Sequence, residues 1–254
     1  MISNDGIVKN LYGLYDDLAG HGLVSSGRTG GFEYVRHEGF AWPNMTYRQS
    51  RSGPATREEL RLLKGSMASG SCPRLVILDG EELTAEIRGA LAEERFIAAT
   101  EWVNMAVPVE RSARSGKQDL LQCREINADD PGEWSQWASV VADVLFKNQP
   151  LDPTLFHQPA IKKQFILMTG YSGRMPVATC LLYLAENAGL YMVATLPAFQ
   201  GKGFGRQLME HAQVAAGARG YEFVVLHSTR TGLNFYIRMG FKNFGKLFLY
   251  YSMQ

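Results

Sequence analysis

The chain has 254 residues, of which 46% are hydrophobic and 20% charged, and its formal net charge is +1. These values are typical of an ordinary folded protein with a sizeable core, arranged as one large domain or two smaller ones. Such a charge supplies no general field for nucleic acid or an anionic membrane, and the longest apolar run, residues 175–185, is too short to span a bilayer.

The cysteines favour a reducing, cytoplasmic setting. Cys72, Cys123 and Cys180 cannot all pair with one another, and no CxxC spacing indicates structural zinc. Asp5 and Lys9 interrupt the first residues, so we expect no signal peptide there. The expectation is a cytoplasmic protein that binds no metal, no nucleic acid and no membrane.

The first part of the chain is predicted to be an α/β region. Apolar residues at helical spacing predict a helix within residues 7–18, whereas residues 25–31, rich in serine and glycine, are predicted to form a loop. Thr56 and Glu59 have the spacing of a capping box, which predicts a second helix starting there. The remaining expected elements are an extended segment at 40–48, a strand at 74–78, a helix at 84–96 and an extended segment at 97–109.

A short polar segment separates the two parts of the chain. Residues 110–119, ERSARSGKQD, have no apolar periodicity and are predicted to form a linker. We therefore expect an N-terminal α/β domain at 1–115 and a second domain at 116–254. Trp42 and Trp102 of the first domain are expected to pack in the core or at the domain interface rather than to contact a substrate.

The elements become more regular from residue 120 onward. Pro131 is placed to begin a helix, residues 146–151 form a loop, and a short helix follows through residue 158. The expected strands and helices are a strand at 121–126, strands at 163–169, 176–184, 190–196 and 221–226, a helix beginning at 204, a helix at 233–239, and two closing strands around Gly245 within 241–251.

Three alternating glycines follow the strand at 190–196. Gly201, Gly203 and Gly205 allow a tight turn and a close approach of the backbone to a ligand. A helix pattern starts at once with Phe204, so N–H groups of the turn and of the helix N-terminus form a nest that suits a phosphate or pyrophosphate. The spacing is neither that of a Walker motif nor that of a Rossmann turn, and a bare glycine-rich turn also serves as a plain connection.

The residues before these glycines extend the pattern. Residues 193–205 resemble the acyl-CoA-binding motif of the GNAT superfamily of N-acetyltransferases, V-x-V-x-P-x-x-Q/R-x-x-G-x-G/A, with Thr195 in place of the second valine. Residues 233–241, LNFYIRMGF, resemble the family's L-Y-x-x-x-G-F segment, with Phe235 in place of leucine. Thr229 stands where many members carry asparagine.

The resemblance covers residues 120–254 and implies a fold. This fold is a GNAT-like α/β arrangement with a mixed, mostly antiparallel central sheet and flanking helices. The first part of the chain has the order strand, helix, strand, helix, strand, which also occurs in the C-terminal half of that fold, but it lacks the glycine motif. It is therefore either a degenerate GNAT-like half or an unrelated α/β region, and the sequence leaves both readings open.

The resemblance also implies an activity, the transfer of an acetyl group from acetyl-CoA to an amine by direct attack in a ternary complex. The implied acceptor is a small-molecule or peptide amine, and the protein is a monomer or a homodimer. The residues implied to contact acetyl-CoA are Val193, Ala194, Thr195, Gln200, Gly201, Lys202, Gly203, Phe204, Gly205 and Arg206.

Tyr236 is the implied proton donor to the departing CoA thiolate. A phenol pKa of about 10 lies above a thiol pKa of about 8.5, so this transfer is uphill by about 2 kcal/mol in water. The site must lower the phenol pKa, or the proton must move as the C–S bond breaks. An amine with a pKa of about 10.4 also calls for a base, and the candidates are Glu186 and His227, each of which reads equally as a structural residue.

Two other functions remain open on the sequence alone. One is a non-catalytic sensor that binds acyl-CoA and regulates a partner, over which Tyr236 favours the transferase, and the other is a transferase that uses a different acyl donor, such as a longer acyl-CoA. Asn148, Gln149 and Asp152 are expected near the acceptor side, where they serve either as substrate contacts or as turn and cap residues.

Overall fold

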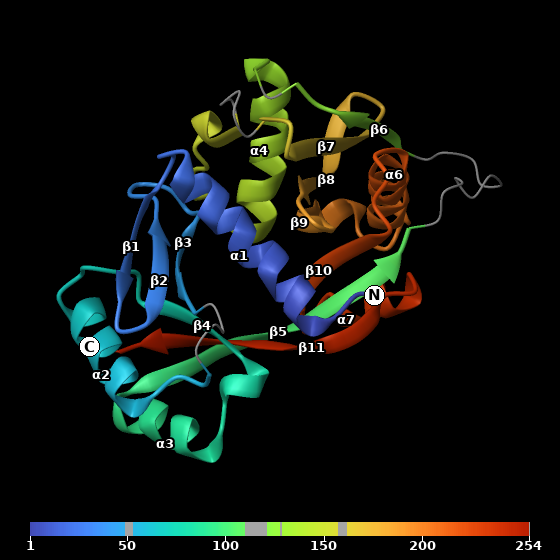
Figure 1. Ribbon diagram of the computed structural model, residues 1–254. Helices are drawn as coiled ribbons and strands as arrows, with labels where there is room; N and C mark the ends of the chain where they lie inside the picture. Colours follow the sequence, from blue (N-terminus) through green and yellow to red (C-terminus); the bar gives the residue numbers. More distant parts are fainter. Residues whose placement is uncertain (49–52, 110–120, 128, 157–161, 254) are drawn as a thin grey trace.

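Figure 1 shows a computed structural model of the protein, which describes residues 1–48, 53–109, 121–127, 129–156 and 162–253. The predicted linker at 110–119 and the boundary between residues 115 and 116 lie outside the described residues. Among the described residues, no helix is both long enough and apolar enough to cross a membrane.

The first half of the chain begins with a long helix and continues with alternating strands and helices. Its helices are α1 (Asn4–Gly20), α2 (Arg57–Ala68) and α3 (Ala85–Glu93), and its strands are β1 (Ser25–Thr29), β2 (Phe32–Arg36), β3 (Asn44–Tyr47), β4 (Leu75–Asp79) and β5 (Phe96–Pro108). The predicted capping box is present, because Thr56 accepts a hydrogen bond from the Glu59 backbone and Glu59 reaches back to Thr56.

The predicted loop at 25–31 is wrong, because residues 25–29 form strand β1, paired with β2 in a hairpin. Thr29 pairs with Phe32, so only Gly30 and Gly31 form the turn, and both have positive φ angles of 51° and 78°. A two-residue turn with two positive φ angles is the type that suits the twist of paired strands, and glycine adopts it without strain. The glycine pair was therefore a hairpin signal rather than a loop signal.

The second half follows the predicted order up to its last element. It consists of β6 (Gln122–Glu125), α4 (Pro131–Leu145), a short 3-10 helix η2 (Pro153–Phe156), β7 (Phe165–Ser172), β8 (Met175–Leu184), β9 (Ala188–Thr195), η3 (Pro197–Phe199), α6 (Phe204–Ala218), β10 (Phe223–Thr229), α7 (Leu233–Arg238) and β11 (Lys242–Ser252).

The described strands form one continuous sheet in the order β1-β2-β3-β4-β11-β5-β10-β9-β8-β7-β6. The last strand of each half pairs with the penultimate strand of the other half. Strand β5 pairs antiparallel with β10, and β11 pairs antiparallel with β4, while β5 and β11 also pair with each other at the centre. The two halves have therefore exchanged their last strands.

This exchange corrects the prediction of two closing strands around Gly245. Residues 242–252 are a single strand, β11, and Gly245 lies at an irregularity in its register with β5 rather than in a hairpin turn. The second neighbour that closes the sheet beside β10 is β5, which lies more than 100 residues earlier in the chain.

The two halves share one topology. In the first half β3 and β4 are parallel neighbours joined by helix α2, and in the second half β9 and β10 are parallel neighbours joined by helix α6. Each parallel pair follows an antiparallel pair of strands, β2–β3 or β8–β9. Of the two readings of the first half, the topology supports the GNAT-like one, and the GNAT-like α/β fold extends over the whole chain.

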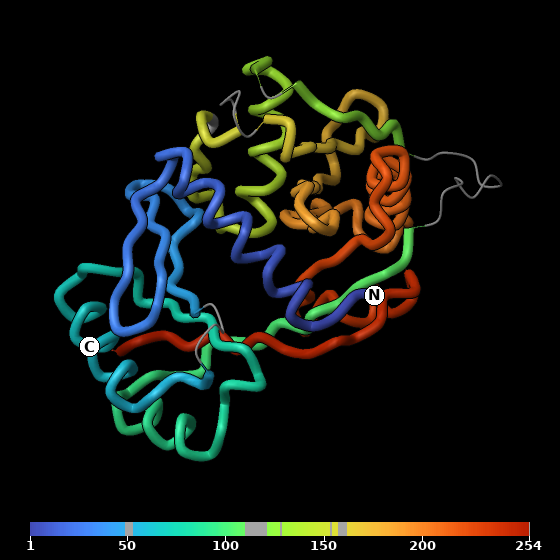
Figure 2. Tube along the Cα trace, in the orientation of Figure 1, coloured from blue at the N-terminus to red at the C-terminus, as the bar shows by residue number. Residues whose placement is uncertain are grey.

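Helix α1 lies between the two halves (Figure 2). It packs with α4 and with strands of both halves in a core cluster on one face of the sheet, whereas α6 packs in a second cluster that contains β8, β9 and β10. Helices α2 and α3 form a third cluster in the first half. Because α1 contacts β5, β9 and β10, an element of the first half lies directly beside strands of the second half.

The exchanged strands predict that the halves do not fold separately. Residues 116–254 alone lack β5, so β10 and β11 each lose a hydrogen-bonding partner, and we expect this fragment to be insoluble or unfolded by circular dichroism. A protease site inserted within residues 110–120 should instead give two pieces that stay together in gel filtration and unfold in one calorimetric transition. Two separate transitions, or separation of the pieces without denaturant, would contradict the exchange.

Candidate active site

The centre of the candidate site is a fork between strands β9 and β10. These parallel strands pair at Ala188 with Val224 and at Gly189 with Val225, and the described ladder contains no further pair between them. Beyond the fork, Met192 has a positive φ of 49°, and the register between β8 and β9 shifts between Thr179 and Leu181. The residues of β9 beyond the fork therefore have β8 on one side and no strand partner among the described residues on the other.

The glycine-rich turn follows the open end of β9. Gly201 and Gly203 have φ angles of 74° and 88°, and a Cβ atom at either position would meet open space. Helix α6 starts at Phe204 with Gly203 as its N-cap, and no described side chain caps it, whereas α1, α2, α3 and α4 are each capped by a serine, threonine or aspartate. The first N–H groups of α6 are therefore available to an external acceptor.

The predicted acyl-CoA contacts gather around this turn. Gln200 Nε2 donates to the Thr195 carbonyl at 3.0 Å, which fixes the start of the turn. A Cβ atom at Gly205 would lie only 3.2 Å from Thr195 Oγ1, so this glycine allows the helix to pack closely against the end of the strand. Lys202 and Arg206 are both exposed, the first 5.0 Å above the Phe199 ring and the second ion-paired with Glu210 at 2.9 Å.

Tyr236 lies on helix α7 and its ring packs against two other aromatic rings. Phe235 and Phe241 contact its ring edge-on, at centroid distances of 5.1 and 5.7 Å, and a Cβ atom at Gly232 would lie 3.0 Å from it. Burial raises the pKa of Tyr236 well above its ordinary value, and the nearby Cys180 thiol adds to the effect. The shift is opposite to the lowering considered from the sequence, so the phenol is held in its protonated form.

The thiol near Tyr236 is affected in the same way. Burial also raises the pKa of the Cys180 thiol, because a buried thiolate loses its hydration. Cys180 is fully buried, whereas Tyr236 is partly buried and packs against the same core cluster.

His227 lies just beyond the fork on β10. Its ring is between those of Tyr191 and Trp102, at centroid distances of 6.2 and 6.3 Å, and its Nδ1 atom is 2.8 Å from Asn104 Oδ1. Burial lowers its pKa to about 3, an effect only partly opposed by the Ile7 carbonyl. The ring is thus neutral at pH 7, and proton removal from an ammonium with a pKa of about 10.4 would be uphill by roughly 10 kcal/mol.

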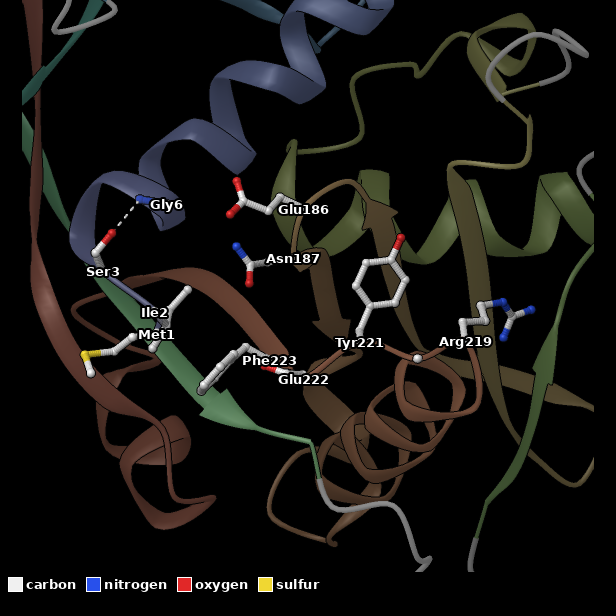
Figure 3. Close-up of a pocket in the computed structure, with 11 residues that line it drawn as sticks. Met1, Ile2, Ser3, Gly6, Glu186, Asn187, Arg219, Tyr221, Glu222 and Phe223 are labelled. Carbon is white, nitrogen blue, oxygen red and sulfur yellow. Dashed lines mark hydrogen bonds between the residues drawn. The ribbon is translucent and has the colours of Figure 1, made fainter.

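Glu186 is not brought together with Tyr236. It lies in the exposed turn before β9, at the opposite end of that strand from the glycines. Figure 3 shows it beside Asn187 and the first turn of α1, on the wall of a pocket of about 380 Å³ whose other wall carries Tyr221 at the C-terminal end of α6. This pocket is separate from the glycine-rich turn because the two lie at opposite ends of helix α6.

The loop expected on the acceptor side has mixed roles. Asn148 and Gln149 are exposed, and Asn148 has a positive φ of 63°. Asp152 instead has structural contacts: one carboxylate oxygen lies 3.0 Å from His37 Nε2, and the other accepts hydrogen bonds from Thr154. The backbone N–H groups of Asn148 and Gln149 donate to carbonyls at the end of α4, whereas their side chains make no hydrogen bond among the described residues.

The corresponding segment of the first half, between β3 and α2, is described only in part. Arg48 follows strand β3 as the glycine-rich turn follows β9, but its side chain is only 4% exposed and pairs with Glu82 at 2.9 Å and with Glu59 at 3.4 Å. Helix α2 is capped by its own Thr56, unlike α6. Among the described residues of this segment, Arg48 and the start of α2 therefore have partners within the protein.

Sequence reasoning missed several residues that surround the fork. The bulge at Met192 has no signal because methionine rarely adopts a positive φ angle, and Tyr191 and Asn104 belong to ordinary strand patterns. Among the described residues no group of His, Cys, Asp and Glu is arranged to hold a metal ion.

Comparison with known proteins agrees with this geometry. Residues 166–243 match the family model described as an acetyltransferase (GNAT) domain. No protein with a curated function matches the chain. The second half thus contains a GNAT acetyltransferase domain.

Solved structures resemble the protein over nearly its whole length. A GCN5-related N-acetyltransferase from Kribbella flavida is 15% identical, with a TM-score of 0.67, and the match covers 95% of this chain and 96% of that one. A GCN5-related N-acetyltransferase from Sphaerobacter thermophilus is 14% identical (TM-score 0.60; 87% and 76% covered), and a putative GNAT acetyltransferase from Novosphingobium aromaticivorans is 12% identical (TM-score 0.58; 94% and 96% covered). At these identities the likeness establishes the shared fold.

The neutral state of His227 predicts an acid-sensitive stability. Its pKa is about 3 in the folded protein and about 6.5 when unfolded, so between these values the unfolded chain binds more protons and stability falls as pH falls. Between pH 7.5 and pH 5 this residue should remove about 2 kcal/mol from the free energy of unfolding. Urea titrations should show that His227→Gln lacks this part of the pH dependence, and an unchanged dependence would contradict the assignment.

Proposed function

We propose that this protein, whose second half carries a GNAT acetyltransferase domain, transfers an acetyl group from acetyl-CoA to an amine by direct attack in a ternary complex. The observation that carries the proposal is the uncapped N-terminus of α6 behind two glycines that face open space, at the end of a strand that leaves its neighbour. Pyrophosphate needs such N–H donors, and an extended pantetheine arm needs such a strand.

Each part of the site has a role in this proposal. Of the N–H groups of residues 200–205, those of 201–205 bind the phosphates, since the Gln200 N–H donates to the Pro197 carbonyl, and Lys202 and Arg206 are nearby charges. Val193, Ala194 and Thr195, beyond the fork, pair with the pantetheine arm. Acetyl-CoA supplies the activated thioester, and in this proposal a backbone N–H near the bulge at Met192 polarises its carbonyl.

Tyr236 would hold the proton that the leaving sulfur needs. Because its pKa is raised, the phenol remains protonated across the neutral and mildly basic range. Turnover that depends on this donor should therefore show no basic limb below the ordinary phenol pKa of about 10. The amine must arrive in its neutral form or lose its proton to water, since neither His227 nor Glu186 is placed as an effective base.

The alternative function is that of an acyl-CoA sensor without turnover. A thiol-release assay with acetyl-CoA and a broad amine panel, run beside calorimetry with acetyl-CoA, separates the two. Thiol release that depends on an amine supports the transferase, whereas binding without release with any amine supports the sensor. Absence of binding by every coenzyme A derivative contradicts both. The shift in melting temperature with acetyl-CoA and with longer acyl-CoAs identifies the preferred donor.

The glycine turn gives a matched pair of variants for cofactor binding. Gly203 and Gly220 lie at the two ends of α6, have φ angles of 88° and 85°, and have no atom within 4 Å of a built Cβ. Either change to alanine should introduce about 1 kcal/mol of strain, but only Gly203→Ala should weaken acetyl-CoA binding, by about tenfold, because its Cβ obstructs the close approach of a phosphate. Equal calorimetric affinities in the two variants would contradict the assignment of this turn.

Tyr236→Phe tests the proton donor. Turnover should fall by about 10²-fold, within the range expected for loss of a general acid, while acetyl-CoA affinity should change little. Tyr250→Phe serves as the control because this buried tyrosine lies in the core cluster of the first half. Unchanged turnover in Tyr236→Phe across the pH range would remove the residue from the mechanism.

A further inference from the structure

A chain of hydrogen bonds connects the first half of the protein to the fork. Asp79 on β4 accepts from Asn4 Nδ2 of helix α1 at 3.1 Å, and Asn4 Oδ1 accepts from Asn104 Nδ2 of strand β5 at 2.7 Å. Asn104 Oδ1 lies 2.8 Å from His227 Nδ1 on β10. Four elements thus contribute one side chain each to a continuous polar path.

The carboxylate at one end fixes the direction of every bond in the path. An ionised carboxylate only accepts, so Asn4 must present its amide nitrogen to Asp79 and its carbonyl to Asn104. Asn104 then presents its own carbonyl to His227, and Nδ1 must carry the hydrogen of the neutral imidazole. The lone pair of the ring is therefore on Nε2.

The sheet is shaped to admit this path. Asn104 is fully buried, and a Cβ atom at Gly245 would collide with the Asn4 carboxamide. Gly245 lies where the register of β11 and β5 is irregular, so the irregular strand and its glycine together make room for Asn4. A polar side chain accommodated in this way is a specific feature of the fold rather than an incidental surface contact.

A second asparagine of α1 holds the neighbouring ring. Asn10 donates to the Asn187 carbonyl at 2.8 Å and accepts from the Tyr191 hydroxyl at 2.7 Å, in a position where any side chain at Gly189 would collide with it. The Tyr191 ring is nearly parallel to that of His227, with an interplanar angle of 26°. Helix α1 therefore holds the Tyr191 ring of β9 directly through Asn10, and the His227 ring of β10 through Asn4 and Asn104.

One atom of this assembly remains without a hydrogen bond of ordinary geometry. His227 Nε2 is shielded from solvent and has no such bond among the described residues, although the Ile7 carbonyl of helix α1 acts on the ring. An unpaired buried acceptor is unfavourable and calls for an explanation. His227 lies on β10 two residues beyond that strand's last pair with β9, and its ring faces that of Tyr191 across the fork.

We propose that His227 Nε2 accepts a hydrogen bond from an N–H of the acceptor amine, and that Asp79, Asn4 and Asn104 are positioning residues that hold its lone pair. This inference rests on the proposed transferase function. A neutral ring orients the amine without removing its proton, in agreement with the lowered pKa of His227. Because Nε2 is shielded in the free protein, acceptor binding must move a neighbouring side chain. The first half then contributes to the reaction through α1 rather than through a second cofactor site.

The tautomer of His227 is measured directly by ¹⁵N NMR of the imidazole in the full chain, with His227→Gln to assign the signals. We expect a hydrogen on Nδ1 and none on Nε2, and we expect the Nε2 signal to change when a reactive amine is added to protein saturated with CoA. A hydrogen on Nε2 in the free protein would overturn the inference. An Nε2 signal that does not change when the amine is added would also overturn it.

Asp79→Asn tests the positioning role with almost no change of shape. The asparagine oxygen should stay on the Glu81 N–H, which turns the amide nitrogen toward Asn4, so the path should reverse and the second tautomer should appear. Turnover should fall about tenfold, the effect of one lost hydrogen bond, while the calorimetric affinity for acetyl-CoA stays within about twofold. Asn4→Ala breaks the path at its middle, and we expect it to change the tautomer and to lower turnover in the same way as Asp79→Asn. Asp143→Asn, on the exposed side of α4, removes the same charge and should change neither tautomer nor turnover.

The outcomes separate this inference from the proposed function. Turnover in the wild type together with an unchanged tautomer and unchanged turnover in Asp79→Asn contradicts the positioning role alone. Absence of turnover with every amine contradicts the proposed function, and with it the assignment of an amine as the partner of Nε2, even when the tautomer is as expected.

Discussion

The exchange of last strands between the halves is the constraint on which the rest of the structure depends. Strand β5 lies between β10 and β11, so the second half is completed by backbone hydrogen bonds from the first. The same strand carries Asn104 and Trp102 to the side of His227. The surroundings of the fork are therefore built from both halves, although the glycine-rich turn belongs to one of them.

The parts of the fold that the sequence predicted are those specified by local pattern. The turn at 200–205, the capping box at Thr56 and the strand–helix order of the second half each follow from residues close together in the chain. The pairing of β5 with β10 could not be predicted, because strand propensity contains no information about which distant strand is the partner. The β1–β2 hairpin was missed although Gly30 and Gly31 carried a local signal.

Burial determines the protonation states at the candidate site. It raises the pKa of Tyr236 and lowers that of His227, so both groups are neutral where a sequence argument assigned one to donate a proton and the other to remove one. A neutral Tyr236 phenol can still donate a proton. The His227 imidazole, with its lowered pKa, cannot remove a proton from an ammonium group effectively. Environment rather than residue type therefore decides which roles these side chains can take.

The buried pair of Arg48 and Glu82 lies in a half whose strands the other half needs. Substitutions that break this pair would disturb the charge balance in the interior of the first half. The loss of stability would not stay there, because β5 and β4 each pair with a strand of the second half. The two halves therefore lose stability together under mutation, although the glycine-rich turn belongs to only one of them.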